Sequence, residues 1–320
     1  MELYFAPLED VSGYRFRNLF NSLFSGVDRF YAPFISAMEP GRKHKKREIE
    51  DVSPANNEGI LLIPQILTNN PRDFLNTAEW LIDKGYKEIN FNLGCPSKDV
   101  VSRGKGSGFL EFPEKLDSFF EEVFSGLAEK NKEDIRISVK TRIGRRDTAN
   151  AGALIEIFNR YPFSEITVHP RLGKDYYRGV PDMDSFRRFY EELKAPVVYN
   201  GDIQTPDDIR KTEEEFPGLK AVMIGRGFIR NPALAREFKG GEPLTIPELK
   251  DFFQKIYAEY RENLHAEKYA LDKMKELWGW LKDNPMLENR QREIRAIMKA
   301  KNNAEYESAV RQVFTDLIRS

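Results

Sequence analysis

Residues 88–97 read EINFNLGCPS, a largely apolar run that ends in Asn92-Leu93-Gly94-Cys95-Pro96-Ser97. A short run of this kind, closed by a glycine and a proline, predicts a buried strand over 88–92 with a sharp turn at its end. Cys95 is the only cysteine of the 320 residues. A lone cysteine is often a packing residue. The glycine lets the backbone approach a ligand and the proline fixes the exit direction, so we expect this thiol to face a ligand.

The segment that follows, 98–108, carries three glycines, Gly104, Gly106 and Gly108, together with cationic side chains. Glycines at this density lower the cost of unusual backbone conformations. We therefore expect a mobile loop over a site.

Outward from residues 88–97, short apolar runs alternate with amphipathic helical stretches up to about residue 240. We predict strands at 3–6, 29–34, 59–66, 88–92, 136–141, 165–169, 196–200 and 221–224. We predict helices at 13–24, 71–84, 113–130, 149–161, 183–193 and 206–215, three of which open on a proline, with Thr205 as the N-cap of the last. Eight strand–helix units predict an α/β fold, a closed (β/α)₈ TIM barrel.

The alternative to this barrel is a doubly wound open sheet. That fold is less favoured because no G-x-G-x-x-G follows the first strand. The weak unit is 37–58, where we expect a long loop on the catalytic face.

Composition changes near residue 240. Beyond Gly240-Gly241 the strand signals end, and apolar residues recur at helical spacing, as in Leu249, Phe252 and Phe253. We predict four antiparallel helices in a small all-α bundle. The predicted domains are a catalytic barrel over 1–240 and a helical domain over 241–320.

Bulk composition excludes several classes of protein. The chain has 40% hydrophobic and 32% charged residues and a net charge of −1, which is ordinary for a globular protein. One cysteine excludes an intramolecular disulfide, and no apolar stretch approaches the roughly 20 residues of a membrane span. We expect a cytoplasmic monomer that binds no membrane. A polyanionic partner would have to meet a local patch such as Arg42-Lys43-His44-Lys45-Lys46-Arg47, although a solvated charge run is the simpler interpretation.

Polar, titratable or glycine residues stand at nearly every predicted strand end. In a barrel the carboxyl ends of the strands surround the active site, so the ring of these residues predicts a site. Its members are Ala6-Pro7-Leu8, Gln65, Asn92 with Cys95, Lys140 with Arg142, His169 with Arg171, Asn200-Gly201-Asp202 and Gly225-Arg226.

Within this ring the residue types suggest particular chemistry. The glycine-rich turns at Gly201 and Gly225, with Arg226 beside them, indicate a phosphate pocket. Lys140 is a candidate Schiff-base nucleophile, general base, or cation beside an electron-rich cofactor, unless it only forms an ion pair. His169 is a site residue or a structural histidine. We expect no metal, because no cluster has ligand spacing.

The same segments resemble the tRNA-dihydrouridine synthase family. The resemblance is carried by Asn92-Leu93-Gly94-Cys95-Pro96-Ser97 and the glycine-rich segment to Gly108, and it spans essentially the whole chain. It continues through Ala6-Pro7-Leu8, Val139-Lys140-Thr141-Arg142, His169-Pro170-Arg171, Asn200-Gly201-Asp202-Ile203, Gly225-Arg226-Gly227 and Lys273-Met274-Lys275. Two departures occur: Leu8 replaces the usual methionine, and Pro170-Arg171-Leu172 replaces the usual Gly-Arg-Thr.

The resemblance implies an FMN-dependent enzyme that reduces the C5–C6 bond of uridines in tRNA, with NADPH or NADH as the hydride source. It implies that Cys95 is the proton donor and that Asn92, Arg142 and Arg171 lie at the substrate. The implied cofactor contacts are Ala6, Pro7, Leu8, Gln65, Lys140, His169, Asn200, Gly201, Asp202, Gly225 and Arg226. The alternatives are another FMN barrel acting on a free pyrimidine, such as a dihydroorotate dehydrogenase, and an RNA-binding protein without catalysis.

Overall fold

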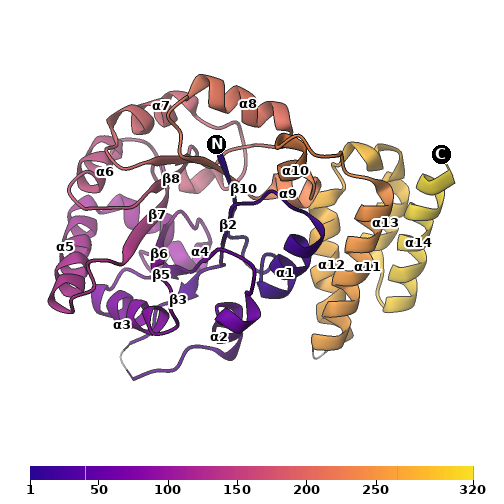
Figure 1. Cartoon of the computed structure of the whole chain (residues 1–320), viewed down its shortest axis with the longest axis horizontal. Coiled ribbons are helices and arrows are strands. Elements are labelled where there is room, and N and C mark those ends of the chain that lie inside the picture. Colours follow the sequence, from indigo (N-terminus) through magenta and orange to yellow (C-terminus); the bar gives the residue numbers. More distant parts are fainter. Residues whose placement is uncertain (40, 265, 320) are drawn as a thin grey trace.

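The computed structural model describes residues 1–39, 41–264 and 266–319. Its elements form a barrel with a stack of helices at one side (Figure 1). No helix in the described part of the chain is long and apolar enough to cross a membrane.

In the described residues, ten short strands form one parallel sheet. They are β1 (Glu2–Phe5), β2 (Arg29–Tyr31), β3 (Ile35–Ser36), β4 (Leu62–Ile63), β5 (Gln65–Leu67), β6 (Glu88–Leu93), β7 (Arg136–Arg142), β8 (Ile166–His169), β9 (Val197–Tyr199) and β10 (Ala221–Ile224). The spatial order is β3-β5-β6-β7-β8-β9-β10-β1-β2-β4. β2 pairs with β4, and β3 pairs with β5.

These pairings close the sheet into the predicted eight-stranded barrel. β2 and β3 are two parts of the predicted strand 29–34, extended to Ser36, and β4 and β5 are two parts of the predicted strand 59–66. Pro64 separates β4 from β5, as expected for a residue that cannot donate a ladder hydrogen bond. The prediction of a (β/α)₈ barrel is confirmed, and the open sheet is wrong.

Helices cover the outside of the barrel. They are α1 (Tyr14–Leu23), α2 (Lys46–Asp51), α3 (Pro71–Ile82), α4 (Lys98–Val101), α5 (Pro113–Glu129), α6 (Ala151–Phe158), α7 (Met183–Glu192), α8 (Pro206–Glu215), α9 (Arg226–Arg230) and α10 (Leu234–Phe238), with 3₁₀ turns η1 (Pro54–Asn56), η2 (Gly106–Glu111) and η3 (Gly173–Asp175). Thr205 caps α8 as predicted: its hydroxyl accepts from the Asp208 N–H at 3.2 Å. This removes one of the unpaired donors at the helix start.

Alternation along the strands separates two apolar clusters. In β1, Leu3 and Phe5 join the large core under the helices, whereas Tyr4 and the adjoining Ala6 join a small cluster inside the barrel. The side-chain period of two along a strand produces this division.

Two sequence expectations about loops were wrong. Residues 37–58 contain α2 and η1 rather than an uninterrupted loop. Residues 98–108 form α4 and the start of η2, where Ser107 is buried and its N–H donates to the Cys95 carbonyl at 3.0 Å. The glycine-rich segment therefore packs behind Cys95. Gly106 and Gly108 lie so close to neighbouring backbone there that neither position has room for a Cβ.

Beyond residue 245 the described chain is helical, with α11 (Ile246–Asn263), α12 (Glu267–Leu281), η4 (Pro285–Arg290), α13 (Gln291–Lys299) and α14 (Asn303–Arg319). The predicted four helices are present and stand beside the barrel (Figure 1). Phe252 of α11 packs edge-on against Phe16 of α1 and against Phe24, the residue that follows α1, with ring centroids 5.5 and 5.4 Å apart. The division into separate domains at residue 240 stays a prediction.

Candidate active site

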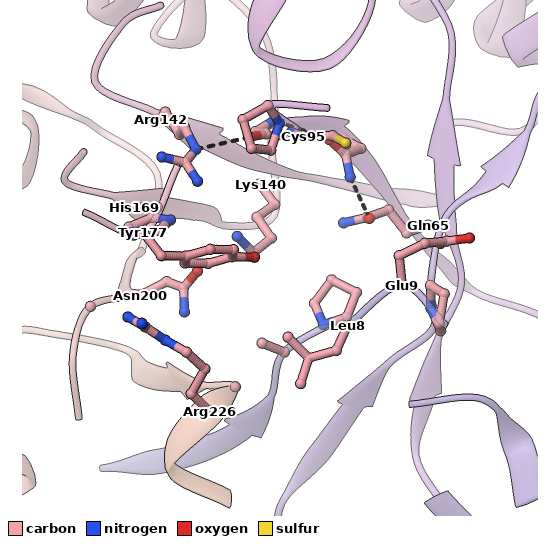
Figure 2. Close-up of a pocket in the computed structure, with 18 of the residues that line it drawn as sticks. Leu8, Glu9, Gln65, Cys95, Lys140, Arg142, His169, Tyr177, Asn200 and Arg226 are labelled. Carbon is pink, nitrogen blue, oxygen red and sulfur yellow. Dashed lines mark hydrogen bonds between the residues drawn. The ribbon is translucent and has the colours of Figure 1, made fainter. Parts of the chain in front are cut away.

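A cavity of about 130 Å³ opens at the carboxyl ends of the strands. Its wall contains every predicted site residue except Arg171: Ala6, Pro7, Leu8, Gln65, Asn92, Cys95, Lys140, Arg142, His169, Asn200, Gly201, Asp202, Gly225 and Arg226. Figure 2 shows the labelled members of this set converging on one space. Parallel strands of a barrel deliver their ends to one face, which explains why segments more than 200 residues apart meet here.

A ladder of amides inside the barrel fixes the Cys95 turn. The Asn92 side-chain oxygen accepts from the N–H groups of Gly94 and Cys95, at 3.0 and 2.9 Å. The Asn92 amide donates to Gln65 Oε1 at 2.7 Å, and Gln65 in turn donates to Asn90 Oδ1 at 2.6 Å. Buried amides with satisfied partners hold one geometry. The ladder therefore holds the thiol-bearing turn in place.

Arg142 fastens the same turn from the other side. Its Nε donates to the Gly94 carbonyl, and its two Nη atoms donate to the carbonyls of Leu172 and Tyr176, each at 2.9 Å. The guanidinium thus joins the Cys95 turn to the loop after β8. Burial lowers the pKa of Arg142 to about 10, so the side chain still carries a charge at neutral pH.

The Cys95 thiol is partly buried and free. Burial raises its pKa, opposed by the N–H of Ser97 and by the cations of Arg142 and Lys140. The thiol is therefore protonated near neutral pH, as a proton donor has to be.

Lys140 and His169 share the deep wall. Burial, with a further contribution from Arg142, lowers the pKa of Lys140 from 10.5 to about 7. Burial and the surrounding cations hold the pKa of His169 well below its usual value, so the imidazole is neutral. Its Nε2 lies 3.3 Å from Arg171 Nη1. Because a guanidinium can only donate, Nε2 accepts there, and Nδ1–H is left for a ligand.

Asp202 organises two arginines at the edge of the cavity. It pairs with Arg171 Nη2 and with Arg226 Nη2, both at 2.5 Å. Arg171 is buried and also donates to the carbonyls of Arg178 and Gly179. The structure places Arg171 behind the cavity wall, not on it. Its predicted contact with substrate stays a prediction, and its visible partners are within the protein.

Gly225 keeps one side of the cavity open. A Cβ at this position would lie 3.1 Å from Leu8 Cδ2 and 3.4 Å from the Ala6 Cβ. Gly225 is also the residue before α9, next to Arg226. The open space and the guanidinium therefore border each other, which suits a phosphate-bearing ligand.

Tyr177 is a cavity residue that the sequence did not reveal. It comes from the loop after β8 and is 44% exposed. The Arg226 guanidinium lies 4.9 Å from its ring centroid, and the Trp280 ring of α12 lies 6.4 Å away. Figure 2 shows its ring reaching between Lys140 and Asn200. The only sequence signal is a pair of adjacent tyrosines in a polar loop at the catalytic face.

Three of the five Lys and Arg side chains in the basic run 42–47 pair with acids in the described part of the chain. Arg47 contacts Glu9 at 3.1 Å and Asp10 at 3.0 Å, and Lys46 lies 3.7 Å from Glu50. His44 stacks on Trp80 at 4.2 Å. Within the described residues, no group of three or more His, Cys, Asp or Glu side chains could hold a metal ion.

The barrel is closed, and its strand ends bring together a thiol, a buried lysine and a glycine turn flanked by an arginine. This arrangement is that of a barrel enzyme. A family model described as "Dihydrouridine synthase (Dus)" matches residues 4–318. The chain therefore belongs to the dihydrouridine synthase family, which identifies it as an oxidoreductase, and the resemblance seen in the sequence is confirmed.

Known proteins agree with this assignment. The chain is 28% identical to "tRNA-dihydrouridine(16) synthase" of Pseudomonas syringae pv. tomato, over 80% of this chain and 82% of that protein. It is 25% identical to "tRNA-dihydrouridine synthase B" of Shewanella oneidensis, over 100% of this chain and 97% of that protein. Among solved structures, morphinone reductase matches 76% of this chain and 87% of its own, with a TM-score of 0.53 and 13% identity. This last likeness concerns the fold alone.

Proposed function

We propose that this protein is a tRNA-dihydrouridine synthase, which reduces the C5–C6 bond of specific uridines in tRNA with FMN as cofactor and NADPH or NADH as reductant. The observation that carries the proposal is the single cavity that holds the Cys95 thiol, the Lys140 amine and the Gly225–Arg226 turn. The names of the relatives support the substrate.

The residues present fit a flavin mononucleotide. Lys140, Arg142 and Arg226 border the cavity. Of its two carboxylates, Asp202 is shared between two arginines and Glu9 pairs with Arg47. This excess of donors and positive charge calls for an anionic ligand rich in acceptors. Arg226 and the backbone at Gly201 and Gly225 would hold the phosphate.

The flavin ring system would lie in the wider part of the cavity. Gln65, Lys140 and His169 would face its edge there. When bound and reduced, a flavin supplies the hydride that uracil C6 requires, and NADPH or NADH restores it.

The cavity is smaller than the roughly 300 Å³ or more of typical ligand pockets. Part of the space is taken by the ring of Tyr177, which lies beside the guanidinium groups of Arg226 and Arg142. We infer that this ring moves aside when the flavin enters.

Cys95 would complete the reduction by donating the thiol proton to uracil C5 as the hydride reaches C6. The bond formed is C5–H, the bond broken is S–H, and the thiolate then takes a proton from water. Arg142 and Lys140 both lower the pKa of Cys95, and so they stabilise that thiolate. The Asn92 ladder keeps the sulfur at a fixed place above the barrel.

A base can reach this cavity only if it leaves its stack. The helices beyond residue 245 border the barrel mouth, and they are the part that an enzyme for a free pyrimidine does not need. The family match through residue 318 includes them, which favours tRNA over a free base. We propose that the protein acts on tRNA in the cytoplasm as a monomer.

The test joins cofactor content to product. The purified protein should be yellow and release FMN on denaturation. It should form dihydrouridine in tRNA from cells that lack this protein, with NADPH present. Release of FAD, or absence of flavin after reconstitution, would overturn the cofactor. Activity on free uracil or dihydroorotate without activity on tRNA would favour the alternative enzyme.

A further inference from the structure

A second cavity of about 500 Å³ adjoins the first. The two share Glu9, Pro33 and Phe34 in their walls. The second cavity lies between the loop after β1, helix α2 and the end of α11, where Tyr260, Asn263 and Leu264 line it. The C-terminal helices therefore form part of its wall.

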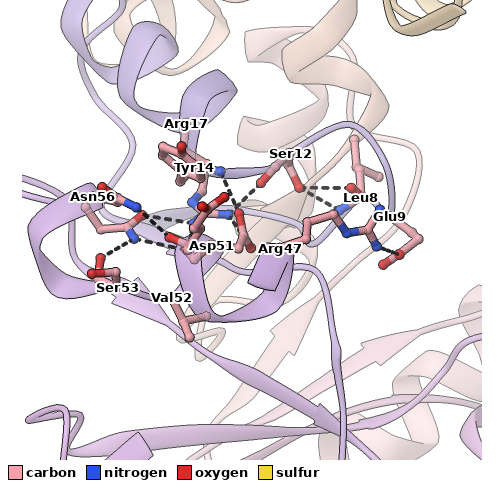
Figure 3. A network of polar contacts seen from close by, with 12 residues as sticks. Leu8, Glu9, Ser12, Tyr14, Arg17, Arg47, Asp51, Val52, Ser53 and Asn56 are labelled. Carbon is pink, nitrogen blue, oxygen red and sulfur yellow. Dashed lines mark hydrogen bonds and ion pairs between the residues drawn. The ribbon is translucent and has the colours of Figure 1, made fainter. Parts of the chain in front are cut away.

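Its barrel wall is held by a buried arginine (Figure 3). Arg17 donates to the Ser12 carbonyl at 2.7 Å, to the Asp51 carbonyl at 2.6 Å and to Asn57 Oδ1 at 2.9 Å. The Asp51 carboxylate accepts from the Tyr14 N–H at 2.6 Å. These bonds tie the start of α1 to the end of α2. The cavity is thus preformed, as ligand sites usually are.

The charges of this wall do not suit a phosphate. Five carboxylates and four cations line the cavity: Glu9, Asp10, Glu48, Glu50 and Asp51 with Arg15, Lys46, Arg47 and Lys273. Each of the four cations has a carboxylate partner: Arg15 with Glu259, Lys46 with Glu50, Arg47 with Glu9 and Asp10, and Lys273 with Asp10. The phosphate of a dinucleotide or of an RNA backbone would meet cations that are already paired with carboxylates, and those carboxylates would repel it.

The remaining surface suits a flat, uncharged ring. Tyr14 is half-buried, Phe34 lies at the junction with the first cavity, and Tyr260 forms part of the far wall. Aromatic side chains stack on nucleobases of any sequence. The carboxylates accept hydrogen bonds from base N–H groups.

We propose that the second cavity binds one unpaired nucleobase of the RNA, next in sequence to the uridine that enters the first cavity. This proposal rests on the proposed function. The two cavities meet at Glu9, Pro33 and Phe34, so two successive nucleotides could occupy them while their phosphates stay outside the acidic wall. Contacts with the nucleotides that flank an extruded base commonly set the choice of site.

Four variants test the cavity. Tyr14→Ala removes a stacking ring, and Tyr14→Phe keeps it. Asn263→Trp fills the cavity from an exposed position, and Glu262→Trp places the same bulk one residue away, outside the wall. The dissociation constant for tRNA and the KM for NADPH in flavin reduction are measured for each variant.

Loss of one stacked base corresponds to roughly 5- to 150-fold in affinity. We expect Tyr14→Ala and Asn263→Trp to weaken tRNA binding within this range, with the KM for NADPH unchanged. Tyr14→Phe and Glu262→Trp should bind tRNA like the wild type. A raised KM for NADPH with unchanged tRNA binding would assign the cavity to the reductant and overturn the proposal.

A second measurement identifies the occupant. Synthetic tRNAs are made with an abasic nucleotide directly 5′ or directly 3′ of the target. One of these abasic tRNAs should bind the wild type more weakly than intact tRNA does. Tyr14→Ala should bind that abasic tRNA and intact tRNA with equal affinity. Equal binding of all three RNAs by the wild type overturns the proposal. Binding is measured without turnover, so the test of the cavity does not depend on catalysis. If the wild type binds tRNA but forms no dihydrouridine, the proposed function is refuted while the binding comparison remains valid.

Discussion

Replacing Lys140 by methionine should stabilise the protein when flavin is absent. Lys140 has a pKa of about 7 in the folded chain against an ordinary 10.5. The unfolded chain therefore binds more protons between these values, and the folded state is destabilised there. The penalty is complete below pH 7 and disappears as the pH rises to about 10.5. At about 1.4 kcal/mol per pH unit, the difference amounts to about 4 kcal/mol at pH 7.

Lys140 lines a cavity that admits water, which reduces the cost of its charge. We therefore expect Lys140→Met to raise the free energy of unfolding at pH 7 by about 2 kcal/mol, half of the full penalty. The assay is urea unfolding of the flavin-free protein at pH 7, 8, 9 and 10. The gain in the free energy of unfolding should shrink steadily over this series. The exposed Lys211→Met on α8 is the control for adding an apolar side chain. A Lys140→Met protein that is no more stable at pH 7, or a gain that is independent of pH, would refute the reasoning.

Four further outcomes are expected. Cys95→Ala should keep flavin and NADPH-dependent flavin reduction but lose about 10²- to 10⁴-fold in dihydrouridine formation; a near-normal rate would make Cys95 a packing residue. Arg171→Met, which leaves Asp202 with one partner, should lower the free energy of unfolding by about 3 kcal/mol, and an unchanged urea midpoint would contradict this. Tyr177→Ala should speed flavin association in stopped-flow fluorescence, because its ring occupies part of the cavity; equal rates would show that it does not obstruct entry. Joint replacement by alanine of three exposed cations of α13 should weaken tRNA binding and flatten its log–log salt dependence by about 0.7 to 0.9 per lost contact, whereas an unchanged slope would move the RNA surface elsewhere. These cations are Arg292, Arg295 and Lys299.

The fold was predictable where the local pattern and the final structure agree. The run before Asn92 is buried throughout in β6, and the prolines at 71, 113 and 206 begin helices as expected. The prediction failed at 46–51, where five of six residues are charged and the apolar period is hidden. Contacts that are distant in sequence maintain α2, among them the hydrogen bonds of Arg17 with Asp51. No local pattern contains that information.

The site was predictable to the extent that strand ends determine it. A residue at the end of a barrel strand must face the catalytic end, and this rule locates Cys95, Lys140 and His169. Tyr177 lies eight residues beyond the end of β8, where only the path of a loop decides whether a side chain enters the cavity. Arg171 sits two residues beyond His169, yet it turns toward Asp202. Spacing alone does not distinguish these cases.

The donors and acceptors that stay available in the cavity also restrict which ligands it can bind. The Asn92 oxygen is used twice by the Cys95 turn, and the Asn200 amide donates to the Met223 carbonyl at 2.6 Å. Asp202 is shared by two arginines. The groups that retain capacity are therefore mainly donors: the second amide hydrogens of Asn92 and Gln65, the amine of Lys140 and the Nδ1–H of His169. A uracil or flavin ring edge is rich in carbonyl oxygens, so such a ligand satisfies these donors, whereas a ligand rich in amino groups would leave them unpaired in a partly buried wall. The preference for a uracil over a cytosine can arise from this imbalance of donors.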